Sequence, residues 1–329
     1  GFLMAKLAVG LDLGGTKIAA CLMDKNGCTV QKKALPTLAE EGPAAVILRM
    51  KSIVYEIMGA ARVTKEDVAA IGICSPGPLD AEQGVVLNPP NLPGWVKVPI
   101  RDILHNEFQV PVVLENDANA ASFGENLFGA GRGAKNFMYI TVSTGIGGGV
   151  ITNGKLFKGA NGNAVEVGHT TINFEGPLCG CGNRGCWELY ASGKSLARFA
   201  EEAIAQGKST MLKDIAGDGN RIRAEDIFAA AKQGDELARE LVAKEGFYLG
   251  VGLANVINSF NPDCIAIGGG LSHEWDLLYE PMMKVMRMRA LRANWENVRV
   301  VKAELGSDAA VIGAAALAWS MVSSEALWL

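Results

Sequence analysis

Three cysteines and one histidine occur close together in the chain, in a pattern that indicates a metal site. Cys179, Cys181 and Cys186 fall within eight residues, and His169 lies ten residues before the first of them. Three thiolates and one imidazole make up the four-ligand set of a structural zinc site, which leaves no coordination position open for water. Three free thiols are the alternative, but a turn rich in glycine offers no core in which to bury them. We therefore predict that these four residues hold a structural Zn²⁺.

Two glycine-rich turns indicate a second kind of chemistry, the binding of phosphate. One turn is Asp12–Lys17 and the other is Ser143–Gly149, and each is expected to join two strands. Without Cβ atoms, successive backbone N–H groups can point into one concavity, which suits phosphate oxygens. Thr16, Lys17 and Thr144 would add hydroxyl groups and a positive charge. Either turn alone is as typical of an ordinary hairpin as of a phosphate site. Two such turns in matching positions predict a nucleotide phosphate held by both.

A group of carboxylates and amides has the chemistry to bind the hydroxyl groups of a sugar. Asn116 and Asp117 follow an apolar strand and open a helix. A carboxylate at a helix start is most often a cap, yet the carboxyl end of a strand in an open α/β sheet is also where ligand-contacting residues concentrate. Glu166, His169 and Glu188 add two carboxylates and an imidazole beside the predicted zinc site. Because carboxylates accept hydrogen bonds from hydroxyl groups, we expect these residues to bind a sugar.

These residues must be positioned by the elements around them, and the hydrophobic pattern predicts an α/β protein built in two related halves. The chain opens with strand, glycine turn, strand and a hairpin signal at Asn26-Gly27, and the same order restarts at Phe137. Alternating strands and helices imply a sheet with helices packed on its faces. Helices are expected over 43–61, 100–108, 117–128, 195–205, 224–231, 236–257 and 309–319, and further strands over 68–74, 112–115, 264–267 and 298–301.

No low-complexity linker separates the halves. We expect an N-terminal α/β domain over 4–135, which carries the first phosphate turn and Asp117. A C-terminal α/β domain over 136–322 would carry the second phosphate turn and the zinc site. The closing helix of the chain is expected to pack back on the N-terminal domain.

Composition and charge exclude several classes of protein. The chain has 329 residues, of which 49% are hydrophobic and 20% charged, as in a globular protein of about two domains. A net charge of −4 argues against nucleic acid or an anionic membrane as the main partner. The longest nearly apolar run, Ala309–Val322, is too short to span a membrane, and no export signal surrounds the expected start at Met4. The seven cysteines form a poor disulfide framework, so we expect a cytoplasmic protein. Cys264 is expected to be a buried core residue.

Together these motifs resemble the ROK family of bacterial sugar kinases and regulators. They occur in the family's order from residue 8 to about 319, nearly the whole chain, and the cysteine segment is the most specific of them. The resemblance implies the actin-like, hexokinase-like ATPase fold, with two α/β domains flanking a cleft and a small zinc-bearing loop. The motifs that carry the resemblance are Asp12–Lys17, Ser75-Pro76-Gly77-Pro78, Asn116-Asp117, Ser143–Gly149, Glu166-x-Gly168-His169, Cys179-x-Cys181-Gly182-x-x-Gly185-Cys186-x-Glu188 and Gly268-Gly269-Gly270.

The resemblance implies phosphorylation of a hexose by ATP, with glucose 6-phosphate as the expected product. Asp117 would be the general base that takes the proton from the sugar 6-hydroxyl. His169 would ligate zinc through one ring nitrogen and face the sugar with the other. The implied sugar-binding residues are Gly77, Asn116, Asp117, Glu166, His169 and Glu188.

The resemblance also implies where the nucleotide would bind. Asp12 would orient Mg²⁺ with its waters, the two glycine turns would hold the phosphates, and Gly269 and Gly270 would lie beside the adenosine. The implied nucleotide-binding residues are Asp12, Gly14, Gly15, Thr16, Lys17, Thr144, Gly145, Gly147, Gly269 and Gly270. Positioning and charge neutralisation would supply most of the catalysis of in-line phosphoryl transfer.

The chain departs from the family's usual pattern at one position. It has Ala164-Val165-Glu166 where Ala-Gly-Glu is usual, and we expect Val165 to narrow the sugar pocket or to shift its backbone. The bulky Trp187 also precedes Glu188 next to the expected sugar site.

Several alternatives remain within and beyond this interpretation. Kinases for N-acetylmannosamine, fructose or allose share these motifs, so the hexose is the main ambiguity. The family's repressors carry a helix-turn-helix domain before the kinase-like body, and a phosphate turn at residue 12 leaves no room for one, so we expect an enzyme. A sugar-sensing regulator that lacks a DNA-binding domain is the alternative from a different class. A zinc hydrolase would need an open metal position, which three cysteines and a histidine do not leave. A homodimer, or alternatively a tetramer, is the assembly that the resemblance implies.

Overall fold

The computed structural model describes residues 6–217 and 219–323 of the chain. The expected start at Met4 lies outside the described residues. Two compact units make up the molecule. Unit 1 comprises the chain up to Lys135, the segment Gly149–Ala164 and the chain from Glu304 onward, whereas unit 2 comprises Asn136–Gly148 and Val165–Ala303.

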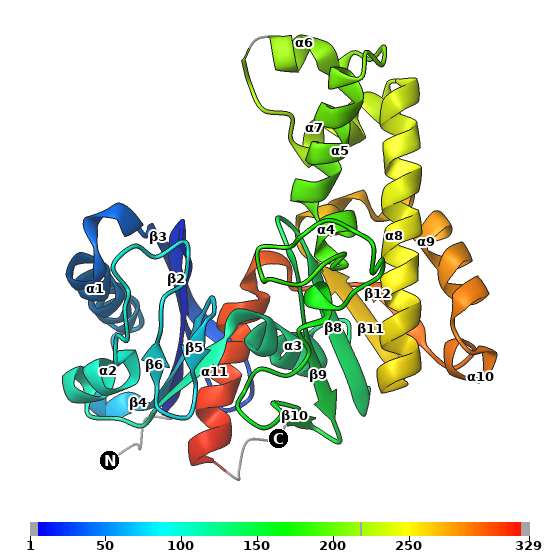
Figure 1. Ribbon diagram of the computed structural model, residues 1–329. Helices are drawn as coiled ribbons and strands as arrows, with labels where there is room; N and C mark the ends of the chain where they lie inside the picture. Colours follow the sequence, from blue (N-terminus) through cyan, green and yellow to red (C-terminus); the bar gives the residue numbers. More distant parts are fainter. Residues whose placement is uncertain (1–5, 218, 324–329) are drawn as a thin grey trace. The chain divides into compact units, whose positions relative to one another are not determined.

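A five-stranded sheet is the centre of unit 1 (Figure 1). Its strand order is β3-β2-β1-β4-β7. β1, β2 and β3 form an antiparallel meander, while β1, β4 and β7 run parallel to one another. The strands are β1 Leu7–Leu13, β2 Lys17–Met23, β3 Thr29–Pro36, β4 Val68–Ser75 and β7 Val112–Asn116.

Helices cover both faces of this sheet. Alternate residues of a strand point to opposite faces, so the apolar side chains of Leu7, Val9 and Leu11 join the core beneath α1 and α2. The other face lies under α11, which also packs along α3. The helices of unit 1 are α1 Pro43–Ala61, α2 Ile100–Phe108, α3 Asp117–Phe128 and α11 Ala309–Val322, with short 3₁₀ turns at η1 Ala39–Glu41, η2 Lys65–Asp67 and η5 Gly306–Asp308 and a small hairpin of β5 Leu79–Asp80 and β6 Val85–Val86.

α11 approaches the sheet closely because glycines lie beneath it. A Cβ atom at Gly10 of β1 would collide with the carbonyl oxygen of Val311, and one at Gly72 of β4 with that of Ala314. The helix is rich in alanine and leaves little space between its backbone and the strands. Its length of 14 residues matches the expectation of a buried helix, and no helix within the described ranges is both long and apolar enough to cross a bilayer.

The second five-stranded sheet repeats the topology of the first. Its order is β10-β9-β8-β11-β12, in which β8, β11 and β12 are parallel and β9 pairs antiparallel with β10. The repeated pattern in the sequence therefore corresponds to a repeated strand order, and the α/β fold class is confirmed. The strands are β8 Asn136–Val142, β9 Ile146–Thr152, β10 Lys155–Leu156, β11 Cys264–Gly268 and β12 Arg299–Lys302.

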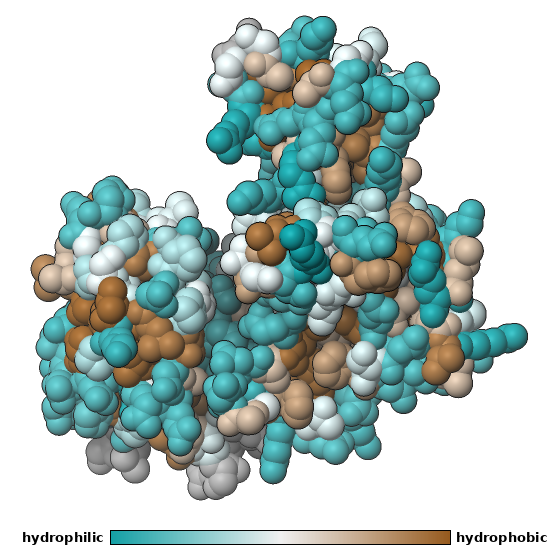
Figure 2. All heavy atoms as spheres, viewed as in Figure 1, coloured by the Kyte–Doolittle hydropathy of each residue, from teal (hydrophilic) through white to brown (hydrophobic). Residues whose placement is uncertain are grey.

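Unit 2 carries a larger set of helices. The long helix α8 packs along α9 and contacts α5 and α7 (Figure 1). Figure 2 shows that the visible surface of α5, α6 and α7 is mostly hydrophilic, as expected for amphipathic helices that bury one face. Cys264 is fully buried at the start of β11, as predicted. The helices are α4 Glu188–Ala191, α5 Gly193–Ala205, α6 Leu212–Gly217, α7 Ala224–Lys232, α8 Glu236–Phe260, α9 Trp275–Arg289 and α10 Arg292–Trp295, with 3₁₀ turns at η3 Val167–His169 and η4 Gly270–Glu274.

Candidate functional site

The parallel strands of unit 1 bring several of the predicted residues to one edge of the sheet. Asp12 of β1 lies in register with Cys74 of β4, and Cys74 lies in register with Glu115 of β7. One residue further along, Ser75 pairs with Asn116. The carboxyl ends of parallel strands are where α/β proteins bind ligands. Asp12, the loop with Gly77 after β4, Asn116 and Asp117 therefore share this edge.

Asp12 is a partly buried carboxylate with a negative neighbour. The pKa of Asp12 is raised from 3.8 to about 6, chiefly by burial and next by the charge of Asp117, whereas a hydrogen bond with Cys74 and the charge of Lys17 act in the opposite direction. A carboxylate beside a second negative charge is suited to a divalent cation, which offsets both charges. The residues present therefore fit the Mg²⁺ that a nucleotide would bring.

The first glycine turn is held by hydrogen bonds to its own backbone and to Thr37. The N–H of Gly14 donates to the carbonyl of Lys17 (3.0 Å), and the Thr37 hydroxyl donates to the carbonyl of Gly14 (2.6 Å). Thr16 and Lys17 are exposed at the tip of the turn. The turn thus keeps its shape without using the side chains that were predicted to bind phosphate.

Asn116, rather than Asp117, caps helix α3. The Asn116 Oδ1 atom accepts a hydrogen bond from the backbone N–H of Asn119 at 2.7 Å. Asp117 occupies the first position of the helix, is exposed, and accepts a hydrogen bond from the N–H of Ala118 through Oδ1 (2.8 Å). The peptide dipoles at a helix N-terminus stabilise a negative charge there. Asn116 therefore fills the capping role that a carboxylate at a helix start commonly has, and Asp117 does not.

In unit 2 the second glycine turn is tied to Glu188. The N–H of Ile146 donates to Glu188 Oε1 (2.8 Å), and a Cβ at Gly145 would collide with the same oxygen. The N–H of Gly193 donates to the carbonyl of Ser143 (2.6 Å). The turn is shorter than predicted, because β9 begins at Ile146 and so Gly147 lies in the strand.

Gly269 and Gly270 lie where the parallel pairing of β8 and β11 would place them, next to the start of the second turn. Gly268 of β11 is in register with Thr141 of β8. Gly269 follows with φ of +85°, and a Cβ there would collide with the carbonyl of Val142. Only glycine combines that backbone angle with such close approach.

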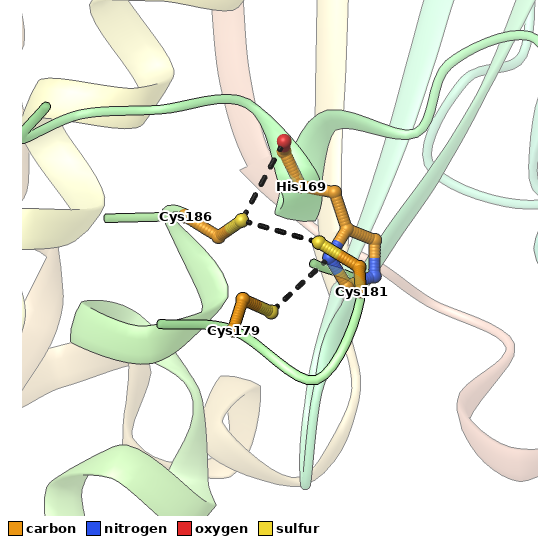
Figure 3. A group of neighbouring side chains, drawn as sticks. All are labelled: His169, Cys179, Cys181 and Cys186. Atoms are coloured by element: carbon orange, nitrogen blue, oxygen red, sulfur yellow. Dashed lines mark hydrogen bonds between the residues drawn. The ribbon is translucent and has the colours of Figure 1, made fainter. Parts of the chain in front are cut away.

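His169 faces two groups with its two ring nitrogens. Nδ1 lies 3.7 Å from the sulfur of Cys179, and Nε2 lies 3.8 Å from Glu188 Oε2. The Sγ atoms of Cys181 and Cys186 are 3.6 Å apart. Figure 3 shows the three sulfur atoms gathered beside the histidine.

The four donor atoms fit a tetrahedral zinc ion. They all lie within 4.8 Å of one another. Zinc–sulfur bonds of about 2.3 Å require ligand separations of about 3.8 Å in a tetrahedron, close to the measured distances. A hydrogen bond from the backbone of Asn183 contributes most to lowering the pKa of Cys181 to about 7, whereas burial raises that of Cys186 to about 12. A bound cation would favour both thiolates.

Glu166 and Val165 begin the segment that leads to His169. Glu166 is exposed, and its carbonyl accepts a hydrogen bond from the N–H of His169 (3.1 Å). Val165 has φ of +67°, a region that favours glycine. A Cβ at Gly148 would lie 3.4 Å from Val165 Cγ1, so the buried valine side chain points toward β9. The backbone therefore keeps a glycine-like conformation despite the valine.

At the sheet edge of unit 1 lie three further residues that the sequence analysis did not single out. Asn91 packs against the first glycine turn, since a Cβ at Gly15 would lie 2.7 Å from its Cβ. Glu115 and Lys158 form an ion pair at 3.3 Å beside Asn116. Asn91 lies in a segment rich in proline, and a polar residue there only weakly indicates a functional contact. No local sequence pattern indicates the pairing of Glu115 with Lys158.

A model of the ROK family matches residues 8–320 of the chain. The chain belongs to the ROK family. Among curated ROK relatives, a glucokinase from Streptomyces coelicolor is 39% identical over 316 residues, which cover 95% of this chain and 97% of that protein. A xylose repressor from Caldicellulosiruptor bescii is 33% identical over 310 residues, which cover 94% of this chain and 77% of that protein.

Solved structures of ROK proteins have the same fold. A ROK hexokinase from Thermus thermophilus superimposes with a TM-score of 0.82 at 36% identity, covering 96% of this chain and 99% of that one. A ROK glucokinase from Streptomyces griseus in complex with glucose and AMPPNP gives a TM-score of 0.77 at 36% identity, covering 95% and 99%. The actin-like ATPase fold predicted from the resemblance is thereby confirmed.

Proposed function

We propose that this chain transfers the terminal phosphoryl group of ATP to a hexose, and that the hexose is glucose. The observation that carries the proposal is the sheet edge of unit 1, where Asp12 and the exposed Asp117 interact electrostatically beside the Asn116 cap. Glucokinases and a hexokinase among its relatives match it over nearly their full length, which supports the same chemistry here. The Streptomyces griseus complex with glucose and AMPPNP supports ATP as the donor.

Asp117 would act on the attacking hydroxyl. In phosphoryl transfer the attacking oxygen loses its proton as its bond to phosphorus forms, so a correctly placed carboxylate needs no strongly raised pKa. The Asn116 cap fixes the start of α3 and thereby the direction of the Asp117 side chain. The remaining sugar hydroxyls would be held by residues that together offer hydrogen-bond donors and acceptors: Gly77, Asn116, Glu166, His169 and Glu188.

The nucleotide phosphates and their Mg²⁺ would be bound in unit 1 by Asp12, Gly14, Gly15, Thr16 and Lys17, and Asp12 would orient the cation with its waters. Magnesium, when bound, neutralises charge that develops on the phosphoryl oxygens. The further residues proposed to contact the nucleotide, all of unit 2, are Thr144, Gly145, Gly147, Gly269 and Gly270.

His169, Cys179, Cys181 and Cys186 would hold one zinc ion. With four protein ligands the metal would be structural. Its place beside Glu188 would orient the side chains proposed to bind sugar, because a metal-bound imidazole has a fixed ring and tautomer.

A coupled assay with ATP, Mg²⁺ and a panel of hexoses tests the proposal. Glucose is expected to give the highest kcat/KM, ahead of mannose, fructose, allose and N-acetylmannosamine. Asp117→Ala is expected to lower kcat by about 10²–10⁴-fold, as for loss of a general base. Glucose affinity, measured by calorimetry, should change only by a modest factor.

Asp24→Ala is a matched control, because Asp24 lies in the exposed hairpin after β2 and its Oδ1 accepts hydrogen bonds from the N–H groups of Asn26 and Cys28. It should keep wild-type turnover. Near-normal turnover of Asp117→Ala would remove Asp117 as the base, and absence of turnover with every hexose would refute the kinase proposal.

A second candidate function rests on the match to the xylose repressor. Because that regulator is similar to this chain over 94% of the length of this chain, a sugar-binding regulator is the alternative. Sugar binding by calorimetry without any ATP turnover would favour it.

A homodimer remains the predicted assembly, with a tetramer as the alternative, and light scattering distinguishes them.

A further inference from the structure

Glu115 is a buried carboxylate directly before the Asn116–Asp117 pair. Its side chain is only 1% exposed. Oε1 accepts hydrogen bonds from the backbone N–H of Asn116 (3.0 Å) and from Asn119 Nδ2 (2.9 Å). These two bonds fasten Glu115 to the peptide that leads into α3 and to the first turn of that helix.

The second oxygen of Glu115 depends on a distant segment of the chain. Among the described residues Oε2 has no hydrogen-bond partner and faces Lys158 Nζ at 3.3 Å. A buried carboxylate oxygen without a partner is costly, and losing one member of a buried pair leaves the other charge uncompensated. The half-exposed Lys158 therefore supplies the compensation that Glu115 needs at this position.

Lys158 belongs to the loop between β10 and Val165, which is closed by backbone hydrogen bonds. The N–H of Phe157 donates to the carbonyl of Val150 (2.9 Å), and the N–H of Ala164 donates to the carbonyl of Lys158 (3.1 Å). The loop and the start of α3 thus fix one another through this ion pair.

We propose that Lys158 is a positioning residue for phosphoryl transfer: through Glu115 it fixes Asn116 and the first turn of α3, and with them the direction of the Asp117 carboxylate. This inference rests on the proposed kinase function. Lys158 acts through Glu115, so its loss reduces turnover by misplacing Asp117. Small displacements of a reacting group can lower a rate by about 10²-fold.

Substitution of Lys158 tests the proposal by kinetics and by hydrogen exchange. Lys158→Met is expected to lower kcat with glucose by about tenfold to a hundredfold while KM for ATP stays near wild type. Lys158→Arg should restore most of kcat, because it keeps the charge. Exchange of the amides of Asn116–Asn119 should be faster in Lys158→Met than in wild type, whether or not substrate is present.

Lys155→Met is the matched control, since Lys155 is an exposed lysine in the neighbouring β10 strand and forms no ion pair in the described part of the chain. It should behave as wild type. The double variant Glu115→Gln/Lys158→Met should be no slower than the slower single variant, because both remove the same pair. If Glu115→Gln does not fold, the comparison of Lys158→Met with Lys158→Arg decides.

Three outcomes would overturn the inference: Lys158→Met behaving like Lys155→Met, effects of the two single substitutions that multiply in the double variant, or unchanged amide exchange at Asn116–Asn119. Failure of the proposed function has a different signature. It would appear as a wild-type protein without hexose-dependent turnover, with the exchange difference between Lys158→Met and wild type still measurable.

Discussion

At the scale of single residues, the charge of Asp12 opposes folding while it prepares a cation site. Burial and the neighbouring Asp117 raise the pKa of Asp12 to about 6, so the folded protein binds this proton more tightly than the unfolded chain does. The stability that Asp12 contributes is present below about pH 4 and is lost as the pH rises through about 6. Near neutral pH the ionised carboxylate therefore destabilises the fold when no cation is bound.

We accordingly predict that Asp12→Asn stabilises the protein above pH 6 while abolishing phosphoryl transfer. A shift of about two pKa units corresponds to about 3 kcal/mol, which sets the upper limit of the gain in unfolding free energy. The gain should shrink between pH 6 and pH 4 and vanish below. Urea denaturation of both proteins at pH 4 and pH 7.5 without divalent cations measures it, and an equal difference at both pH values would contradict it.

At the scale of elements, the loop that holds the four metal ligands contains little secondary structure. Between the 3₁₀ turn at Val167–His169 and α4 its order depends on short backbone pairings such as Leu178 with Arg184 and Thr171 with Cys186. A metal that crosslinks His169 to the cysteines would supply the missing stability, because binding energy of a structural metal becomes folding energy.

We predict one tightly bound zinc per chain, whose removal lowers both Tm and hexose affinity. Affinity should fall because His169 Nε2 and Glu188 lie 3.8 Å apart and lose their fixed orientation with the metal. Cys181→Ser should reduce zinc content and Tm, whereas Cys28→Ser, at an exposed cysteine outside the cluster, should change neither. Elemental analysis of carefully purified protein checks the stoichiometry, and a metal-free, fully stable wild type would contradict the prediction.

The packing of α11 against α3 is a second feature of elements, and it depends on two glycines. A Cβ at Gly313 of α11 would collide with the carbonyl oxygen of Ala120, and one at Gly124 of α3 would lie 2.6 Å from that of Ala309. The obstructing atoms are backbone atoms, which cannot rotate away. Any added methyl group must therefore move one helix relative to the other, and α3 begins at Asp117.

We predict that Gly313→Ala destabilises the protein by about 1–3 kcal/mol or more, as overpacking of a core does, and lowers kcat as well. Urea midpoints and the coupled assay measure the two effects. Gly59→Ala in α1 is the control, because outside the neighbouring backbone of α1 no atom lies within 4 Å of a Cβ there. It should stabilise α1 by up to about 1 kcal/mol through helix propensity. Equal stability of the two variants would mean that the α3–α11 contact tolerates a larger separation.

At the scale of the whole molecule, local patterns were sufficient for most of the fold. Pro43 in the first turn and apolar residues at helical spacing predict α1 with its observed bounds, and Asn26-Gly27 predicts the hairpin between β2 and β3. Helix α9 is absent from the expectations drawn from the sequence, and it contains Pro281, a residue type that disfavours a helix interior. That proline packs on Gly246 of α8, so tertiary contacts override a local helix breaker.

The candidate site divides in the same way. The cysteine cluster and the Asn116–Asp117 pair follow from residue types and spacing over short distances in the chain. The contacts of Glu115 with Lys158 and of Gly15 with Asn91 join segments that are far apart in the sequence, so their partners are fixed only by folding. Spacing also did not reveal that Asn116 takes the cap position, since both residues suit it by type.

Unit 1 is assembled from both ends of the chain, and this determines how the protein must fold. Helix α11 covers the face of the sheet formed by Gly10 and Gly72, and the Trp319 side chain donates from Nε1 to the carbonyl of Met23 (3.1 Å). Glu125 of α3 accepts hydrogen bonds from the N–H groups of Glu304 and Leu305. Without the segment from Glu304 onward, this face of the sheet would be open to water and the Glu125 carboxylate would lose two donors.

We predict that a chain ending at Ala303 loses the stable structure of unit 1 but keeps that of unit 2. All strands of the parallel set β8, β11 and β12 and the helices α4–α10 are present in such a chain, whereas the core beneath α11 is not. Hydrogen exchange followed by mass spectrometry should show loss of protection in β1 and β4 and retention of protection in β11. Burial of apolar area is the main source of stability, and α11 has nine buried residues. The folding free energy lost with this helix should therefore exceed what the remaining contacts of unit 1 can offset. Full protection of β1 and β4 in the shortened chain would show that the first sheet is stable without its closing helix.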